Sequence, residues 1–223
     1  MTKRTLLLLA SNSPRRRELL SLGSWMFSVS ASNVDETQRS GEAPAEYVLR
    51  LAEAKARAAS RDVRPPHVII GADTAVVDET RILGKPRDRL EATAMLKSLR
   101  GYPHRVYTAL AVLRIPDERL VTDLCVTRVP MRNYSDEEIE AYVRSGDPLD
   151  KAGAYGIQHR KFHPVAAMTG CYASVMGLPL CHLVRILNKM NVHPRADIPA
   201  ACQSLLQYQC PVSSAILRGE QAG

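Results

Sequence analysis

A short polar and basic stretch, residues 11–16, combines the groups that bind phosphate. Its sequence is Ser-Asn-Ser-Pro-Arg-Arg, and it follows an apolar run. Pro14 suits the first position of a helix and Ser13 suits its cap, so we expect a helix N-terminus whose N–H groups and dipole attract anions. Arginines in a first helical turn oppose that dipole unless an anion offsets them. The stretch predicts a polyphosphate site that includes Ser13, Arg15 and Arg16, and the alternative is a solvated first turn.

Asp73 lies inside an apolar run, residues 68–77, that predicts a buried strand. A carboxylate in such a place is destabilising unless it is ion-paired, hydrogen-bonded or bound to a metal. Asp35 and Glu36 form an acidic pair in a polar stretch and become candidates for a shared site only if Asp73 lies nearby. The alternative is a turn at the end of the strand, capped by Asp73.

Two lysines are placed where an ammonium could meet an anion. Lys55 shares the apolar stripe of a helix predicted for residues 45–60, with Val48, Leu51, Ala52 and Ala59. It either points into a cleft or extends to the edge of the apolar face, as buried lysine stems usually do. Lys85 occupies a Gly-Lys-Pro turn and could also reach an anion.

Residues 148–158 contain the features of a loop that holds a flat ligand. Two glycines flank Tyr155 and allow close backbone approach, and Gln158 offers both a donor and an acceptor. Gln158 could contact the edge of a nucleic base, and the alternative is that it bridges a turn.

The sequence lacks the patterns typical of several other kinds of functional site. His159 and His163 have metal-like spacing but no third ligand nearby, and Ser11 and Ser13 are not part of a Gly-x-Ser-x-Gly nucleophile motif. No Walker motif is present. The five cysteines are an odd number without a Cys-x-x-Cys pair, which suits a reducing cytosol and predicts no zinc site.

The elements that must position these residues alternate between strand and helix. Strands are predicted at residues 6–10 and 68–77, a hairpin at 105–113 and 120–129, and a further strand near 172–176. Helices are predicted at 14–22 and 45–60, after the Asp88/Glu91 pair up to Gly101, after the Ser135/Glu138 capping box up to Gly146, and finally at 179–190. The pattern indicates an α/β fold with a mixed sheet.

Length and composition describe an ordinary globular chain. Of 223 residues, 45% are hydrophobic and 24% charged. No apolar run approaches the ~18 residues of a membrane span, and the N-terminal leucine run is too short for a signal peptide, so we expect a cytoplasmic protein. The net charge of +7 attracts polyanions, but it is dispersed. We expect one domain at residues 1–192 and a C-terminal extension of unpredicted structure at 193–223.

Seven segments together resemble the Maf family of nucleoside triphosphate pyrophosphatases, over about residues 5 to 190. They are ASNSPRR at 10–16 with ELL at 18–20, VDE at 34–36, LAEAKA at 51–56, GADT at 71–74, GKP at 84–86, DKAGAYGIQ at 150–158 and VMGLP at 175–179.

The resemblance implies hydrolysis of a nucleoside triphosphate to the monophosphate and pyrophosphate, with dTTP and UTP preferred and modified pyrimidine nucleotides as further candidates. It also implies an elongated, twisted mixed sheet flanked by helices, two lobes around a cleft, and a homodimer. A divalent cation is implied as cofactor: Mg²⁺, with Mn²⁺ or Co²⁺ as alternatives. No membrane and no specific nucleic acid are expected as partners.

The resemblance also implies roles for individual residues. Asp73 resembles the family's proton acceptor, which activates water with the metal's help, and Glu36 its acidic residue at the metal. Lys55 belongs with them in the catalytic group. The residues that resemble triphosphate contacts are Ser13, Arg16, Lys55 and Lys85, and those at base-selecting positions are Arg15, Thr74 and Gln158.

One departure concerns the base. A glycine usually follows the glutamine in this family, whereas His159 stands here, and residues 160–170 depart from the usual Gly-rich loop. A Cβ at position 159 is expected to restrict the turn that holds Gln158.

Three alternatives stay open. One is a 7-methyl-GTP pyrophosphatase of the same family, and another is a nucleotidyltransferase, which would need an acceptor substrate. The third is a non-enzymatic nucleotide- or nucleic-acid-binding regulator linked to septum formation, suggested by the +7 charge and the family's association with that process. A binder of single strands would interleave aromatic residues with basic ones, which this chain does not.

Overall fold

A six-stranded mixed sheet organises the chain. The structure, a computed structural model, describes residues 6–31, 33–61, 63 and 67–223. Its strands are β1 (Leu6–Leu9), β2 (Phe27–Val29), β3 (His67–Asp78), β4 (Arg81–Leu83), β5 (Pro103–Arg114) and β6 (Arg119–Pro130). Their order is β2-β1-β3-β5-β6, with β4 paired to β3. β1 runs parallel to β2 and β3, and the other pairs are antiparallel. The predicted α/β fold with a mixed sheet is confirmed.

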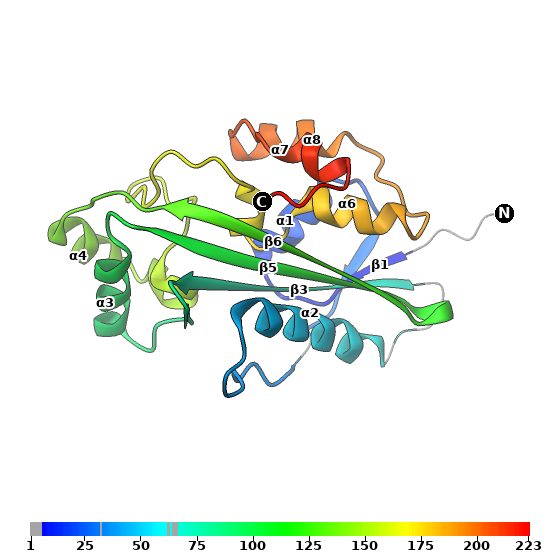
Figure 1. Ribbon diagram of the computed structural model, residues 1–223, viewed down its shortest axis with the longest axis horizontal. Coiled ribbons are helices and arrows are strands. Elements are labelled where there is room, and N and C mark those ends of the chain that lie inside the picture. Colours follow the sequence, from blue (N-terminus) through cyan, green and yellow to red (C-terminus); the bar gives the residue numbers. More distant parts are fainter. Residues whose placement is uncertain (1–5, 32, 62, 64–66) are drawn as a thin grey trace.

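Helices cover both faces of the sheet (Figure 1). The α-helices are α1 (Pro14–Ser21), α2 (Pro44–Ser60), α3 (Arg89–Leu99), α4 (Asp136–Arg144), α5 (Tyr172–Val175), α6 (Leu180–Asn188), α7 (Ile198–Leu206) and α8 (Ser213–Leu217), and the short 3₁₀ helices are η1 (Ile115–Asp117), η2 (Asp147–Asp150) and η3 (Ala152–Ala154). In Figure 1, α2 lies along one face, α1 and α6 lie on the other, and α3 and α4 lie at the far end of the long β5–β6 hairpin. In the described part of the chain, no helix is long and apolar enough to cross a membrane.

The long strands bury alternate side chains on opposite faces of the sheet. In β3, Ile70 belongs to the core shared with α1 and α6, whereas Ile69 belongs to the core against α2. This period of two is the expected pattern for a strand covered on both faces. A third core joins the far ends of β3, β5 and β6 to α3 and α4. The same long strands therefore serve two lobes, the first with α1, α2 and α6 and the second with α3 and α4.

Helices with local capping signals form where the sequence predicts them. Asp88 Oδ1 accepts from Glu91 N at 2.8 Å at the start of α3. At α4 the capping box is complete, because Ser135 Oγ accepts from Glu138 N and Glu138 Oε2 accepts from Ser135 N. The predicted hairpin is also confirmed, as β5 and β6 pair along their whole lengths.

Two predictions near the C-terminus are wrong. The strand predicted near 172–176 is instead the helix α5 (Tyr172–Val175), because this segment packs on β5 and β6 and does not pair with a sheet edge. The helix predicted at 179–190 forms as α6 but is not the last, since α7 and α8 follow it. A local signal for α7 exists, because Asp197 caps it and accepts from Ala200 N at 3.1 Å. The strands β2 and β4 were not predicted.

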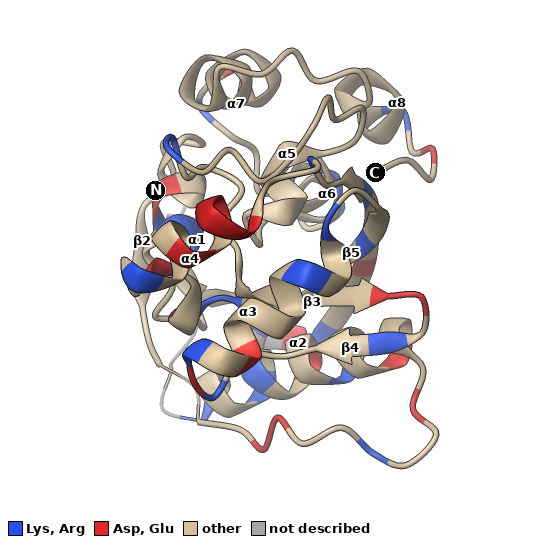
Figure 2. Ribbon diagram, turned by 90° about the vertical axis from the view of Figure 1, so that its left-hand side faces the viewer, with Lys and Arg blue, Asp and Glu red and all other residues tan. Residues whose placement is uncertain are grey.

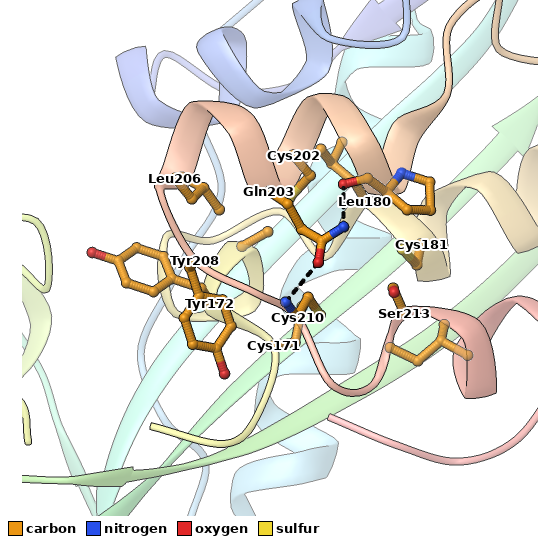
Figure 3. A pocket seen from close by; sticks show the side chains of 13 residues that line it. Cys171, Tyr172, Leu180, Cys181, Cys202, Gln203, Leu206, Tyr208, Cys210 and Ser213 are labelled. Carbon is orange, nitrogen blue, oxygen red and sulfur yellow. Dashed lines mark hydrogen bonds between the residues drawn. The ribbon is translucent and has the colours of Figure 1, made fainter. Parts of the chain in front are cut away.

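Residues 193–223 pack against α6 through α7 and α8 (Figure 1). Beneath α7, the Gln203 side chain joins Pro199 O to Cys210 N at 3.2 and 2.9 Å, as Figure 3 shows. Four cysteines line an apolar pocket of about 20 Å³ there, which has room for little more than one water: Cys171, Cys181, Cys202 and Cys210.

A buried ion pair holds the C-terminal segment in place. Arg185 of α6 donates twice to Asp123 Oδ2 of β6, at 2.6 and 3.0 Å, and both side chains are 10% exposed. The same guanidinium donates to the carbonyl of Glu220 at 2.9 Å. It therefore connects the sheet, α6 and the C-terminal segment.

Arg185→Met is expected to lower the thermal stability of the fold. The substitution leaves the Asp123 carboxylate buried and unpaired, which costs about 3–5 kcal/mol. In a domain of this size, the melting temperature should fall by roughly 6–20 °C. Thermal unfolding checks this, with Arg119→Met as the control, because Arg119 is exposed and its side chain donates only to Lys189 O among the described residues. Equal melting temperatures in the two variants would contradict it.

Candidate active site

The predicted site residues meet in one cleft beside a gap in the sheet. β1 pairs with β3 only as far as Ile70, and β4 pairs with β3 from Val76 onward. Between these points, this edge of β3 pairs with no other described strand, and a cleft of about 860 Å³ lies alongside. All nine predicted residues line it: Ser13, Arg15, Arg16, Glu36, Lys55, Asp73, Thr74, Lys85 and Gln158.

The N-terminus of α1 forms one wall of the cleft. Ser13 caps the helix and accepts from Arg16 N at 3.4 Å, and Ser11 Oγ accepts from Ser13 N at 3.2 Å. In the sequence, Ser11 belongs to the predicted anion-binding stretch and lacks the motif of a nucleophile. Here it is an acceptor that shapes the turn leading into the helix.

Arg16 joins three segments that are distant in sequence. Its guanidinium donates to Ser11 Oγ, to Thr74 Oγ1 and to the carbonyl of Gly177, at 3.2, 3.1 and 2.8 Å. Gly177 has φ +102°, and a Cβ there would lie 3.1 Å from Arg16 Nε, so only glycine suits this contact. Burial lowers the pKa of Arg16, and the Asp73 carboxylate opposes that shift. Arg16 is thus held in one orientation toward the cleft.

Lys55 lies between the two candidate metal ligands. Its Nζ is 2.6 Å from Asp73 Oδ1 and 2.7 Å from Glu36 Oε1. Lys55 is only 8% exposed, so it does not extend to the edge of the helix. A Cβ on Gly71 would lie 2.1 Å from the carbonyl of Ala52, and this close packing of α2 on β3 brings the ammonium to the carboxylate.

Asp73 is the buried acid of the site, with 6% of its surface exposed. It lies in the middle of β3, opposite Ala109 of β5, and not at a strand end, so the alternative of a capping turn is wrong. Burial raises the pKa of Asp73, while the Lys55 ammonium beside it and the more distant Arg16 lower that pKa. Its proton affinity is therefore set by a balance between desolvation and two cations.

The loop that carries Glu36 is held by α2 residues that sequence analysis missed. Tyr47 donates to the carbonyl of Glu36 at 2.9 Å, and Arg50 donates to the carbonyl of Thr37 at 3.1 Å. Burial and the nearby carboxylates raise the pKa of Tyr47 to about 12, which keeps its hydroxyl protonated as a donor. Asp35 is exposed and accepts from Thr37 N instead of lining the cleft.

Gln158 lies in a turn that lines the same cleft. Its side chain is exposed and makes no hydrogen bond to any described residue, so its amide is free for a ligand. His159 does not have a positive φ, so the turn accepts a side chain at this position without backbone strain. The Nδ1 atom of His159 accepts from Phe162 N at 3.0 Å, so this ring nitrogen is engaged within the turn.

The family model for Maf-like proteins matches residues 6–190, most of the chain. The chain belongs to the Maf family.

Several Maf relatives match over most of their own lengths. A protein of Geotalea uraniireducens named dTTP/UTP pyrophosphatase is 46% identical over 86% of this chain and 98% of its own. Proteins of the same name from Dehalococcoides mccartyi and Bacillus cereus are 42% and 44% identical, over 85% and 83% of this chain and 84% and 96% of theirs. A solved dITP/XTP pyrophosphatase from Mycobacterium abscessus covers 57% of this chain and 75% of its own at 16% identity, with a TM-score of 0.36, a likeness too weak to support an argument.

Two basic side chains of the Maf cleft have no partner among the described residues. Arg15 and Lys85 line it, and neither side chain forms a hydrogen bond or ion pair within the described part of the chain. Lys55, in contrast, is already paired with two carboxylates. A polyanion entering the cleft would therefore meet Arg15, Lys85 and the α1 N-terminus first.

Proposed function

We propose that this protein hydrolyses nucleoside triphosphates, with dTTP and UTP preferred, to the monophosphate and pyrophosphate. The name shared by relatives that are 41–46% identical over most of the chain supports the reaction and the pyrimidine preference. The observation that carries the proposal is the buried Asp73–Lys55–Glu36 cluster in a cleft whose wall is a basic helix N-terminus. This combination suits the binding and hydrolysis of a polyphosphate.

Asp73 is the proposed proton acceptor. In its ionised form it takes a proton from water as the water oxygen bonds to phosphorus and the bond between the α and β phosphates breaks. The raised pKa of Asp73 makes it a better base than an exposed aspartate. Lys55 holds the Asp73 carboxylate in place, and its positive charge keeps a fraction of the Asp73 side chains ionised.

A divalent cation, Mg²⁺ first, suits Asp73 and Glu36. Both carboxylates already contact one cationic atom, Lys55 Nζ, so they are close enough to share a second cation. Among the described residues no group of three His, Cys, Asp or Glu forms a metal site. Mg²⁺ commonly binds to one or two carboxylates plus substrate phosphates, which fits this donor set. When bound, the ion would offset the negative charge of the triphosphate.

The remaining residues bind the substrate. Ser13, Arg15, Arg16 and Lys85 are the proposed triphosphate contacts. Thr74 Oγ1 accepts from Arg16 and from Thr108 at 3.1 Å each, so its role in base selection works through the position of Arg16. Gln158 is the proposed contact to the base edge.

Gln158→Glu is expected to change base preference much more than phosphate binding. A carboxylate can accept but not donate, so it loses the hydrogen bond to an acceptor on the base, and the kcat/KM ratio of dTTP over CTP should fall about tenfold or more. The Ki of inorganic tripolyphosphate should stay within about threefold. Pyrophosphate release from dTTP, UTP, CTP, GTP and 7-methyl-GTP with Mg²⁺ checks this, with the exposed Gln221→Glu as the control.

The same panel tests the function itself. A preference of the wild type for 7-methyl-GTP would keep the reaction and overturn the pyrimidine preference. Turnover only with an acceptor substrate would favour a nucleotidyltransferase, and no turnover would favour a binding role. Figure 2 argues against broad polyanion binding on the side it shows, because acidic and basic residues are mixed along α2, α3 and α4.

We also propose a cytoplasmic location and a catalytic domain of residues 1–192, to which residues 193–223 are an addition. All five cysteines are free thiols, which suits a reducing compartment. The homodimer stays a prediction.

A further inference from the structure

His159 occupies the turn directly after the proposed base contact. Its Nδ1 accepts from Phe162 N at 3.0 Å, and its own N–H donates to the carbonyl of Gly156 at 3.0 Å. Because a backbone N–H points at Nδ1, that nitrogen must be the unprotonated one of the ring. The side chain thus closes the turn on one side of Gln158 and the backbone closes it on the other.

The imidazole also packs on Tyr142, which contacts both sides of the same turn. The two ring centroids are 4.6 Å apart, and Tyr142 stacks on Phe162 at 4.3 Å. The Tyr142 hydroxyl accepts from Gly156 N at 2.9 Å and donates to Asp147 at 2.6 Å. Tyr142 belongs to α4 and is buried, so the turn is fixed to the second lobe of the molecule.

We propose that His159 is a positioning residue that holds Gln158 in the orientation that contacts the nucleic base. This inference rests on the proposed function, in which Gln158 contacts the base. Gln158 has no hydrogen-bond partner of its own among the described residues, so the direction of its amide depends on the backbone of the turn. A turn that is already ordered avoids the entropy loss of ordering it on binding. His159 therefore contributes to base affinity without touching the base.

The imidazole supplies an acceptor and a packed ring, and three variants separate these contributions. His159→Gly removes both, His159→Phe keeps a ring without the acceptor, and His159→Asn keeps an acceptor for Phe162 N without the ring. His163→Gly is the matched control, because His163 is exposed in the same loop and has φ +43°, a conformation that glycine adopts freely.

The measurements are kcat and KM for dTTP and CTP, the Ki of inorganic tripolyphosphate, and the Kd of α,β-methylene-dTTP by calorimetry. For His159→Gly we expect KM for dTTP and the Kd of the analogue to rise about tenfold, and the dTTP-over-CTP preference to fall similarly. We expect kcat and the Ki of tripolyphosphate to stay within about twofold, since neither depends on the base contact. His159→Asn should recover more of the preference than His159→Phe, because the hydrogen bond sets the turn.

Unchanged base affinity in His159→Gly would overturn the proposal. So would a parallel rise in the Ki of tripolyphosphate, which would mean that the cleft as a whole had lost its shape. If the wild type turned over no nucleotide, the proposed function would fail separately. The Kd values of the analogue and of tripolyphosphate would still decide the role of His159.

Discussion

Asp73→Asn lowers kcat for dTTP hydrolysis by about a thousandfold in our expectation, while nucleotide affinity changes by less than about threefold. Loss of a positioned general base typically reduces the rate by about 10²–10⁴. The asparagine keeps the shape of the aspartate and an acceptor for Lys55, whose ammonium stays paired with Glu36. The triphosphate contacts at α1 and Lys85 lie on other segments and are retained. Pyrophosphate release and the Kd of α,β-methylene-dTTP measure the two effects.

The control for this prediction is Asp78→Asn on the same strand. Asp78 lies at the end of β3, five residues away, where it pairs with Arg81 at 3.5 Å and does not line the cleft. It should retain wild-type kcat. Wild-type turnover by Asp73→Asn would remove Asp73 from the role of base, and equal losses in both variants would indicate a general effect of the strand.

Lys55→Met is expected to shift the pH dependence of kcat/KM to higher pH. The Lys55 ammonium is the largest influence that lowers the pKa of Asp73 against the raising effect of burial. A cation at this distance typically lowers a carboxyl pKa by about 1–3 units. Its removal should therefore move the acidic side of the pH–rate profile to higher pH by about that many units. A base acts only when deprotonated, so activity is lost as pH falls through its pKa. The variant should therefore lose activity at a higher pH than the wild type and recover part of it in alkaline solution.

The pH–rate profile from about pH 5 to 9 checks this prediction. Arg57→Met is the matched control, because Arg57 lies two residues further along α2, is exposed and pairs with Glu53. Its profile should superimpose on that of the wild type. A Lys55→Met profile with the same acid limb and only a lower plateau would show that Lys55 does not set the pKa of Asp73.

Local sequence predicted the elements whose stabilising signals lie within a few residues. Ser13, Asp88 and Ser135 each accept from a backbone N–H three residues on, so the starts of α1, α3 and α4 depend on adjacent residues alone. The β5–β6 hairpin and the buried strand β3 have equally local patterns. In contrast, β2 and β4 are three residues long and form because a partner strand is present. The α5 segment has the composition of a strand but forms a helix, because it packs on the face of the sheet.

The site shows the same division. The sequence by itself predicted a basic cleft that contains acidic residues and binds a polyphosphate, because charge and hydrogen-bonding capacity belong to the side chains. The residues whose types and spacing led to this prediction are Ser13, Arg15, Arg16, Lys55, Asp73 and Gln158. The tertiary structure alone decided the partners. In the folded chain Lys55 forms ion pairs with Asp73 and Glu36, and Arg16 donates a hydrogen bond to the carbonyl of Gly177, which is 161 residues away. Partners so far apart in sequence meet only when the strands and helices pack, and no local pattern records that packing.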